Sequence, residues 1–392
     1  MGNRAAPSGL SIVGLFAGIG GIEKGLENAG HRIILTCEVD PLAQAVLRRH
    51  HSDVELWDDI NTLPSLPKAD VVAAGFPCQD LSQAGRTAGI RGRNSGLVGR
   101  VFELLEKAGD SYPHWLLLEN VPFMLQLDRG KAMRFLTESL EELGFAWAYR
   151  IVDTRSFGLP QRRQRVIMLA SRTEDPRPVL FADDAGDPGD PDPDGRACGF
   201  YWTEGIRGLG WAIDAVPTLK GGSTVGIPSP PAILMPNGDG SDHVVTPDLR
   251  DAERLQGFDS DWTKVEMPDG KPVRLGRRWK LVGNAVSVPV SEWVGGCLKA
   301  PGPYNPTEDE IVQNGDRWPT AAWGHDGKVR RVEVSRWPLR KRRRSLKPFL
   351  KYKTPLLSAR AAQGFRSRMR SSSLRFPERL VEAMSVHIVE VE

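Results

Sequence analysis

The stretch Ser11-Ile-Val-Gly-Leu-Phe-Ala-Gly-Ile-Gly-Gly21 joins an apolar run to a turn that is rich in glycine. Glycine allows a tight turn and a close approach to a ligand because it has no Cβ to clash. The residues that follow are predicted to form a helix, whose positive N-terminal end points toward a bound group. The turn is therefore a candidate ligand-binding loop, made of Phe16, Gly18, Ile19, Gly20 and Gly21.

Glu38 ends the next apolar run, about 20 residues after the turn. A carboxylate at this spacing can accept hydrogen bonds from ribose hydroxyls, so the two features together favour a cofactor that contains adenosine. The turn offers a single Gly-x-Gly step, which makes NAD a poorer fit than another adenosine cofactor. The alternative is that Glu38 is an ordinary carboxylate at a strand end.

The first 170 residues alternate between short apolar runs and amphipathic stretches. Continuous apolar runs are typical of parallel strands that are covered on both faces, so the alternation predicts a doubly wound, mostly parallel α/β sheet. The expected strands are 10–16, 33–37, 70–75, 115–119, 147–153 and 166–170. The expected helices are 21–29, 41–50, 97–108 and 131–143.

The alternation ends near residue 175. Residues 182–195 are rich in Asp, Gly and Pro and are predicted to form a loop. We expect residues 1–174 to form a catalytic and cofactor-binding domain and 175–245 a smaller, irregular or β-rich domain. A return segment, 246–302, with helices at 246–258 and 287–298, should complete the first domain. Residues 303–392 form a basic extension whose fold the sequence leaves open.

Composition excludes several classes of protein. The chain has 392 residues, 40% of them hydrophobic, which is enough for a folded core. No apolar run approaches the roughly 20 residues of a membrane span, and we find no signal peptide. The four cysteines, at 37, 78, 198 and 297, are too scattered for a zinc site or a disulfide framework. We therefore expect a cytoplasmic protein without membrane contact and without a metal.

The net charge of +3 is unevenly spread along the chain. Between Lys328 and Arg379 there are 18 Lys and Arg but 2 Asp and Glu, whereas the remainder holds 34 basic and 47 acidic residues. This asymmetry indicates a polyanionic partner. The alternative is a solvated, partly ordered extension.

Cys78 lies in the loop Gly75-Phe-Pro-Cys-Gln79, just past the third expected strand. Open α/β sheets place their ligands at the carboxyl ends of their strands, so a cysteine there is a candidate nucleophile. A small buried thiol is the alternative, and it is the interpretation we give to Cys37, Cys198 and Cys297.

Glu119 ends the fourth expected strand, after Trp115-Leu-Leu-Leu118. An apolar wall disfavours a charged carboxyl, so Glu119 could donate a proton near neutral pH. A salt-bridged strand-end acid is the alternative. In Gln161-Arg-Arg-Gln-Arg165, residues 161, 163 and 165 would share one face of an extended segment, where two guanidiniums can hold a carboxylate or phosphate. A solvated basic loop is the alternative there.

In this order, the pieces resemble the DNA cytosine-5 methyltransferase family from about Ile12 to Pro289. Phe16–Gly21 resembles its first cofactor motif, and Pro77-Cys78-Gln79 its catalytic loop. The Glu119-Asn-Val121 and Gln161-x-Arg163-x-Arg165 segments resemble two further motifs, as do 254–258 and 283–286. Two positions depart from the pattern: Asp58 precedes Asp59-Ile60 where Gly is usual, and Asp259 replaces a common Pro.

The resemblance implies S-adenosylmethionine as the cofactor, S-adenosylhomocysteine as its product, and no metal. Cys78 would add to carbon 6 of cytosine while Glu119 protonates N3, and Arg163 and Arg165 would orient this carboxyl, neighbouring groups and DNA phosphate. Carbon 5 then takes the methyl group, and loss of its proton expels Cys78. Beyond the glycine turn and Glu38, the implied cofactor contacts are Val39, Asp59, Ile60, Pro77, Leu97, Asn284 and Val286.

The resemblance also implies that duplex DNA is the partner and that the target base is flipped out of the helix. Residues 79–97 would form a mobile basic loop over the DNA, and 175–245 would be a target recognition domain. The implied DNA contacts are Gln79, Ser82, Arg93, Gln161, Thr218, Leu219, Lys220 and Gly221. We expect a monomer of bacterial or phage origin, paired with a restriction endonuclease or acting alone.

Three alternatives remain at this stage. The fold also serves cytosine-5 methyltransferases that act on transfer RNA, and a non-catalytic DNA-binding protein could keep the same fold. The intact Cys78, Glu119 and arginines argue against the second of these. The glycine spacing and the cysteine loop argue against a nicotinamide-dependent oxidoreductase.

Overall fold

The computed structural model describes residues 9–76, 96–204, 206, 208–222, 229–237, 241–266, 270, 272–313 and 315–391. The chain divides into two compact units that interleave along the sequence. Unit 1 comprises Met1–Asp153, Gln164–Asp187 and Val286–Leu339. Unit 2 comprises Thr154–Arg163, Pro188–Ala285 and Arg340–Glu392.

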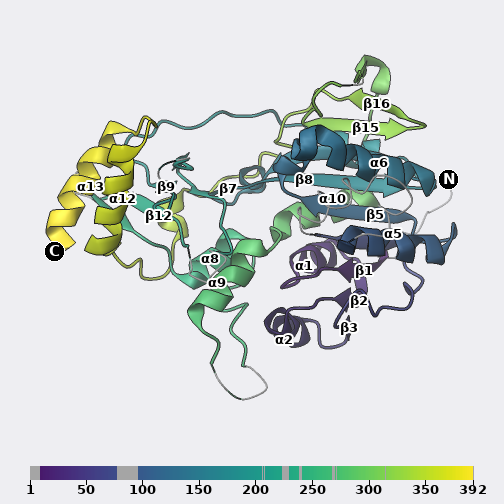
Figure 1. Ribbon diagram of the computed structural model, residues 1–392, viewed down its shortest axis with the longest axis horizontal. Coiled ribbons are helices and arrows are strands. Elements are labelled where there is room, and N and C mark those ends of the chain that lie inside the picture. The colour runs from purple at the N-terminus through teal and green to yellow at the C-terminus, as the bar shows by residue number, and fades with distance from the viewer. Residues whose placement is uncertain are drawn as a thin grey trace, which may run out of the picture. The chain divides into compact units, whose positions relative to one another are not determined.

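Unit 1 is built on a sheet whose strands follow the order β14-β16-β15-β6-β8-β5-β4-β1-β2-β3 (Figure 1). Strands β1 to β5 pair in parallel, whereas β6, β8 and β14 to β16 pair antiparallel with their neighbours. The strands are β1 (Ser11–Leu15), β2 (Arg32–Cys37), β3 (Glu55–Trp57), β4 (Val71–Ala74), β5 (Trp115–Asn120), β6 (Ala146–Asp153), β8 (Gln164–Ser171), β14 (Glu310–Ile311), β15 (Ala321–His325) and β16 (Lys328–Arg331).

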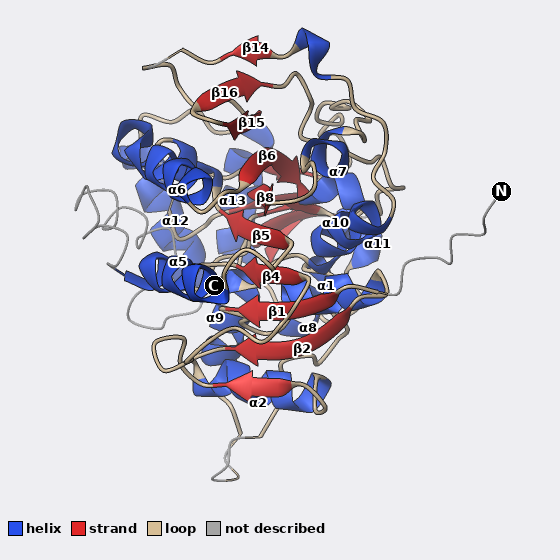
Figure 2. Cartoon of the chain, turned by 90° about the vertical axis from the view of Figure 1, so that its right-hand side faces the viewer, coloured by secondary structure: helices blue, strands red, loops and turns tan. Residues whose placement is uncertain are grey.

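Helices cover both faces of this sheet. Figure 2 shows α5 (Gly96–Ala108) and α6 (Lys131–Glu142) on one face. The other face carries α1 (Gly21–Asn28), α7 (Arg177–Phe181) and α10 (Val288–Lys299). Helix α2 (Pro41–His50) begins where the Asp40 carboxylate accepts hydrogen bonds from the Leu42 and Ala43 amides, with Pro41 in the first turn. The sequence thus predicted a doubly wound fold correctly, although the sheet is mixed rather than mostly parallel.

The core beneath α5 and α6 explains why the strands are so apolar. Val13, Val72 and Leu116 of the central strands are at most 1% exposed. They belong to one cluster with Leu105 of α5 and Leu136 of α6. Because the helices bury one strand face and α1 and α10 bury the other, alternation of polar and apolar residues is absent from these strands.

Unit 2 contains a four-stranded antiparallel sheet in the order β10-β9-β12-β13, which agrees with the β-rich segment expected from the sequence. Unit 2 also contains a separate short sheet in which β7 and β11 pair in parallel. Its strands are β7 (Gln161–Arg162), β9 (Cys198–Phe200), β10 (Ala212–Ile213), β11 (Val216–Pro217), β12 (Ala232–Pro236) and β13 (Asp242–Val245). Its helices are α8 (Leu249–Leu255), α9 (Leu275–Asn284), α11 (Leu346–Phe349), α12 (Ala359–Ser371) and α13 (Glu378–Val391).

The basic extension is folded into both units rather than solvated. Residues 303–339 add β14 to β16 to the sheet of unit 1. Residues 340–391 belong to unit 2, where Phe365 of α12 and Met384 of α13 are at most 1% exposed and pack against Phe200 of β9. The expected return segment 246–302 is divided at Val286, and the expected boundary at 174 lies within a stretch of unit 1 that runs to Asp187.

Candidate active site

Glu119 lies at the carboxyl end of the central parallel strands of unit 1. Strands β4 and β5 pair in parallel with Ala74 opposite Leu118, so Gly75 and Glu119 are the next residues on the two strands. A Cβ built on Gly75 would lie 3.7 Å from Glu119 Oε2. The chain that leads to Cys78 therefore leaves the sheet directly beside the Glu119 carboxyl.

Cys78 itself lies outside the described residues, as do Pro77, Gln79, Ser82 and Arg93. Cys78 follows Phe76 by two residues in the sequence. Its proposed role therefore depends on the connectivity from Gly75 and Phe76, both of which the structure describes.

Asn120 fixes the start of that loop. Its Nδ2 donates to the Phe76 carbonyl at 3.1 Å, and its Oδ1 accepts from the Val121 amide at 2.8 Å. Asn120 is 5% exposed and Phe76 is 4% exposed, so the bond is buried. Sequence reasoning noted Asn120 only as part of a motif, and this bond gives it a positioning role.

Arg165 is the arginine that contacts Glu119. Its Nε lies 2.8 Å from Glu119 Oε1, and both side chains are nearly buried. This contact is an ion pair by its distance. It is not a well-aligned hydrogen bond, and Glu119 Oε1 accepts no hydrogen bond from the described residues. A second nitrogen of the guanidinium, Nη1, donates to the Gln164 carbonyl at 2.7 Å. The predicted pairing of a carboxyl with an arginine of the Gln-x-Arg-x-Arg segment is present, and it holds the Glu119 carboxyl in one direction.

Arg163 makes different contacts and belongs to unit 2. Its Nη2 donates to the Ala285 carbonyl at 2.7 Å, and its Nη1 to those of Leu219 and Gly283 at 3.2 and 3.4 Å. The side chain is 1% exposed. The guanidinium thus ties the end of α9 to the loop after β11. Because the chain passes between the two units after Arg163, the alternation of 163 and 165 does not give both arginines the same surroundings.

Gln161 and Leu219 were predicted to contact DNA, and in the structure both side chains are buried within unit 2. Gln161 is completely buried, and its Nε2 donates to the Leu255 carbonyl at 2.8 Å and to Gln256 Oε1 at 3.1 Å. Its Oε1 accepts from the Leu219 amide at 3.0 Å, and Leu219 is 1% exposed. The Gln161 amide is therefore used inside unit 2, where it positions the Thr218-Leu219 turn. The DNA contacts of Gln161 and Leu219 stay predictions.

The neighbouring residues stay partly accessible. Thr218 Oγ1 donates to the Arg162 carbonyl at 3.0 Å. Lys220 pairs with Glu204, and its Nζ lies 3.9 Å from the centre of the Tyr201 ring. A Cβ built on Gly221 would lie 2.5 Å from Asn284 Oδ1, so glycine is required there for space. Asn284 is exposed, which leaves it able to meet a ligand.

The glycine turn of unit 1 combines left-handed backbone with an open side. Gly18 and Gly20 have φ of 57° and 82°, in the left-handed region that favours glycine. A Cβ built on Gly18 would meet no described atom within 4 Å, so this side of the turn is open. A Cβ on Gly21 would instead lie 2.3 Å from the Val286 carbonyl oxygen. Gly21 is thus needed for packing and Gly18 for the open turn.

Glu38 connects this turn to the end of β2. Its Oε2 accepts from the Gly18 amide at 2.7 Å and its Oε1 from the Asp40 amide at 2.8 Å. A carboxylate has about four lone-pair sites, so each oxygen can still accept a hydroxyl. The side chain is held in place by the backbone and remains half-buried, which suits the ribose-binding role expected from the sequence.

The other predicted cofactor residues of unit 1 differ in their exposure. Val39 is 69% exposed beside Glu38, and Asp59 is half-buried with its Oδ1 bound to the Asn61 amide at 2.9 Å. Leu97 is half-buried against the core. Ile60 is 4% exposed, and its carbonyl accepts from Arg100 Nε. Val39 and Asp59 can therefore meet a ligand, while the Ile60 side chain belongs to the core.

Glu23 is a buried acid near the turn that sequence reasoning missed. It is 1% exposed in α1 and accepts no hydrogen bond from the described residues. It lies under β1, where a Cβ built on Gly14 would lie 2.1 Å from Glu23 Oε1. Burial raises the pKa of Glu23 to about 7, because it disfavours the charged carboxyl. The sequence signal was a Glu between apolar and glycine residues on a helix predicted to cover a sheet.

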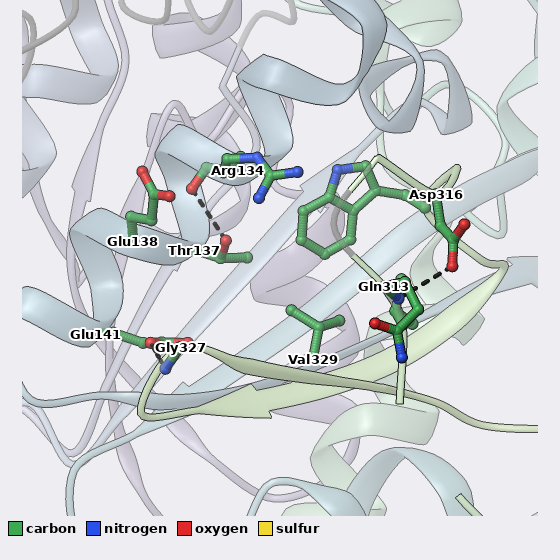
Figure 3. Close-up of a pocket in the computed structure, with 10 residues that line it drawn as sticks. Arg134, Thr137, Glu138, Glu141, Gln313, Asp316, Gly327 and Val329 are labelled. Carbon is green, nitrogen blue, oxygen red and sulfur yellow. Dashed lines mark hydrogen bonds between the residues drawn. The ribbon is translucent and has the colours of Figure 1, made fainter. Parts of the chain in front are cut away.

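One pocket of unit 1 lies away from the catalytic edge. A pocket of about 150 Å³ is lined by α6, by the segment before β15 and by β16, and Figure 3 shows Glu138, Glu141 and Asp316 in its wall. No predicted site residue lines it.

Among the described residues, no group of three or more His, Cys, Asp and Glu could hold a metal ion. No helix in the described part of the chain is long and apolar enough to cross a membrane.

Comparison with known proteins gives consistent matches. The profile of the C-5 cytosine-specific DNA methylase family matches residues 10–184. The Type II methyltransferase M2.BsuMI of Bacillus subtilis (strain 168) is 50% identical over 386 residues, which cover 96% of this chain and 97% of that protein. The Type II methyltransferase M.NgoBI of Neisseria gonorrhoeae is 30% identical over 71% of this chain and 90% of that protein. The crystal structure of the S. pombe Dnmt2 methyltransferase aligns with a TM-score of 0.53 at 16% identity, covering 74% of this chain and 98% of that one, which supports the fold.

Proposed function

This chain belongs to the C-5 cytosine-specific DNA methylase family and is a DNA (cytosine-5) methyltransferase, and on that premise we propose that Cys78 attacks a flipped-out cytosine of duplex DNA. The methyl group would come from S-adenosylmethionine. The single observation that carries the proposal is the position of Glu119 beside Gly75, where the chain turns toward Cys78. An acid and a nucleophile near one strand edge are what the addition to the pyrimidine ring requires.

The glycine turn and Glu38 fit the nucleoside part of the cofactor. The open side of Gly18 gives room for close approach, and Glu38, held by the Gly18 and Asp40 amides, can accept the ribose hydroxyls. Val39 and Asp59 lie at the same sheet edge, with an apolar surface and a carboxylate for the adenine. Asn284, Val286, Pro77 and Leu97 are proposed as further contacts. When bound, S-adenosylmethionine supplies an electrophilic methyl group, and S-adenosylhomocysteine is its product.

The residues of this chain activate the base. The Cys78 thiolate forms a bond to carbon 6 of cytosine, and the electron pair of the 5,6 double bond moves toward carbon 5. Glu119 gives a proton to N3, which keeps negative charge from building up on the ring. Arg165 holds the Glu119 carboxyl in position, and Asn120 holds the Phe76 carbonyl two residues before Cys78. After methylation, a base takes the proton from carbon 5, the 5,6 double bond reforms, and Cys78 leaves as a thiolate. N3 then returns its proton to the Glu119 carboxylate, which restores the neutral ring.

We assign sequence recognition to unit 2. The turn Thr218–Gly221 is held by Gln161 and Arg163 through backbone hydrogen bonds, so its outer residues have a defined position. Thr218, Lys220 and Gly221 are the proposed DNA contacts on this turn, together with Gln79, Ser82 and Arg93 in the loop after Cys78. Because two relatives are named Type II methyltransferases, we propose that this monomeric enzyme protects the sites of a cognate restriction endonuclease.

A covalent adduct tests the chemistry. Duplex DNA with 5-fluorocytosine at the target cannot lose a proton from carbon 5, so the wild-type enzyme should stay bound to it through Cys78, as denaturing gels and peptide mass spectrometry will show. The target sequence comes first, from bisulfite sequencing of DNA from cells that express the protein. Cys78→Ser should bind cofactor and DNA but form no adduct and no 5-methylcytosine. Normal turnover by this variant would exclude Cys78 as the nucleophile, and methylation of transfer RNA alone would contradict the DNA substrate.

A further inference from the structure

The segment Arg340–Pro348 is basic and firmly attached to unit 2. It contains six Lys and Arg among nine residues. The Lys341 amide donates to the Ser156 carbonyl at 3.1 Å, and the Leu346 amide donates to Asp214 Oδ1 at 2.7 Å. Asp214 is 3% exposed and Leu346 is fully buried. The backbone of this segment therefore has a fixed path, in contrast to a solvated basic tail.

Arg343 is engaged in this attachment, whereas Arg342 and Arg344 face solvent. Arg343 pairs with Asp214, its Nη2 lying 3.4 Å from Oδ2. Arg342 and Arg344 are exposed, and neither makes an ion pair with any residue that the structure describes. Lys341 is exposed beside them. Lys341, Arg342 and Arg344 thus place positive charge on a fixed backbone, which favours an anionic ligand.

These side chains line a hollow. Arg342, Arg343, Arg344, Ser345 and Pro348 surround a space of about 600 Å³. The pocket in Figure 3 has the opposite character, because Glu138, Glu141 and Asp316 in its wall would repel an anion. Guanidiniums bind phosphate oxygens in a bidentate manner, and a hydroxyl adds a donor. The lining contains no aromatic ring on which a base could stack, so it suits a phosphodiester backbone better than a nucleotide base.

We propose that the hollow formed by Arg342, Arg344 and Ser345 binds the phosphate backbone of the duplex DNA substrate and sets the register of the recognition turn. Leu346 and Phe349 lie in the same core cluster as Leu219 of that turn, so the basic segment and the turn are parts of one packed body. Phosphate contacts position a protein on DNA without reading its sequence. The proposal depends on the proposed function only for the choice of duplex DNA as the polyanion.

The test is the salt dependence of DNA binding by Arg342→Gln/Arg344→Gln. Binding of a non-specific duplex is measured by fluorescence anisotropy from low to moderate salt. Each phosphate contact contributes about 0.9 to the slope of log K against log salt, so two lost contacts should lower the slope by about two. At roughly 0.1 M salt, this predicts binding that is ten-fold weaker or more. With target DNA, the KM for DNA should rise while kcat at saturating DNA stays unchanged.

Two control variants make the result specific. Truncation of the chain is unsuitable, because residues 346–391 contribute Leu346, Phe365 and Met384 to the core of unit 2. Arg134→Gln/Arg317→Gln removes the same charge from exposed positions of unit 1 and should leave the slope unchanged. Arg342→Lys/Arg344→Lys keeps the charge and should keep most of the slope. Equal thermal unfolding of all variants shows that the fold is intact.

An unchanged slope in the Gln variant would overturn the proposal, as would an equal loss in the unit 1 control. Weaker binding of single-stranded RNA with unchanged binding of duplex DNA would assign the hollow to RNA and also overturn it. The measurement needs neither cofactor nor methyl transfer. A protein without methylation activity that shows the expected slopes would therefore contradict the proposed reaction and keep the phosphate site.

Discussion

The polar side chains at the sheet edge of unit 1 and those around the recognition turn of unit 2 are used in opposite ways. In unit 1, Glu38 is half-buried and Glu119 is 8% exposed, and each is held by one neighbour at the carboxyl end of a strand. In unit 2, Gln161 and Arg163 are buried and spend their hydrogen bonds on backbone groups. The first pair can act on a ligand, whereas the second pair determines where a turn lies. Gln161 and Arg165 lie four positions apart in one motif but act differently. Gln161 bonds backbone groups of unit 2, whereas Arg165 pairs with the Glu119 carboxyl of unit 1.

The largest expected effect separates chemistry from folding in unit 1. Glu119→Gln removes the proton that N3 needs, so kcat should fall by about 10²- to 10⁴-fold, the usual range for a positioned acid. Binding of S-adenosylmethionine should change little, because Glu119 lies beside the cysteine loop rather than at the glycine turn. Single-turnover methylation assays and isothermal titration measure the two quantities. A variant that keeps normal kcat would remove Glu119 from the mechanism.

Arg163 should show the reverse behaviour. Arg163→Gln removes the Arg163 donor from the carbonyls of Leu219, Gly283 and Ala285, of which the Ala285 carbonyl keeps a 3.4 Å bond from Gln256 Nε2. Each unsatisfied buried group costs about 1–3 kcal/mol. We expect the free energy of unfolding of unit 2 to fall by roughly 3 kcal/mol, as denaturant titration followed by tryptophan fluorescence will measure. Trp279 lies in the same cluster as Leu219 and Val282 and reports on this region. A stable Arg163→Gln protein with lost catalysis would place Arg163 with Glu119 in function after all.

Glu23 tests the buried part of unit 1 through pH. Burial raises the pKa of Glu23 from 4.5 to about 7, so the folded protein binds this proton more tightly than the unfolded chain. Its contribution is therefore fully present below about pH 4.5 and is lost as pH rises toward 7. Glu23→Gln removes the titration, so the wild type should lose roughly 3 kcal/mol relative to the variant across this window. Denaturant titrations of both proteins at several pH values measure the difference. Parallel stability curves would show that Glu23 does not titrate there.

The sequence predicted the regular half of the molecule well, for a physical reason. Strands β1, β2, β4, β5, β6 and β8 lie within two residues of their predicted ranges, because strands that are buried on both faces appear as continuous apolar runs. Short or charged elements have no such signal. Strand β3 has three residues, and β16 is Lys-Val-Arg-Arg, so neither could be found by hydrophobic pattern. Helix α9 contains three basic residues among ten and was missed in the same way.

The site was predictable where residues act near their place in the chain. The Gly18 amide and the Glu38 carboxylate meet because β1 and β2 are adjacent parallel strands, which the alternation of strands and helices already implies. The burial of Gln161 depends on Leu255 and Gln256, which lie 94 and 95 residues away. No local pattern reveals such partners, so a glutamine in a basic segment was predicted to face DNA. The same reason hid the attachment of the basic extension to Asp214.

The smallest expected effect concerns Asn120, which shares features with both the catalytic-edge residues of unit 1 and the backbone-bonding residues of unit 2. Its amide donates to the Phe76 carbonyl, so it spends a hydrogen bond on the backbone, as Gln161 does, but it acts on the loop that carries the nucleophile. Asn120→Ala loses the hydrogen bonds to the Phe76 carbonyl and from the Val121 amide, each worth about 1 kcal/mol of stability, and leaves Phe76 less restrained. We expect kcat to fall about five- to ten-fold with the KM for cofactor unchanged. Asn120→Gln is the matched control: it keeps the amide but lengthens the side chain, so it tests whether the position of the amide matters. If Asn120→Ala loses stability but keeps its full kcat, the bond is structural only, and Asn120 belongs with Gln161.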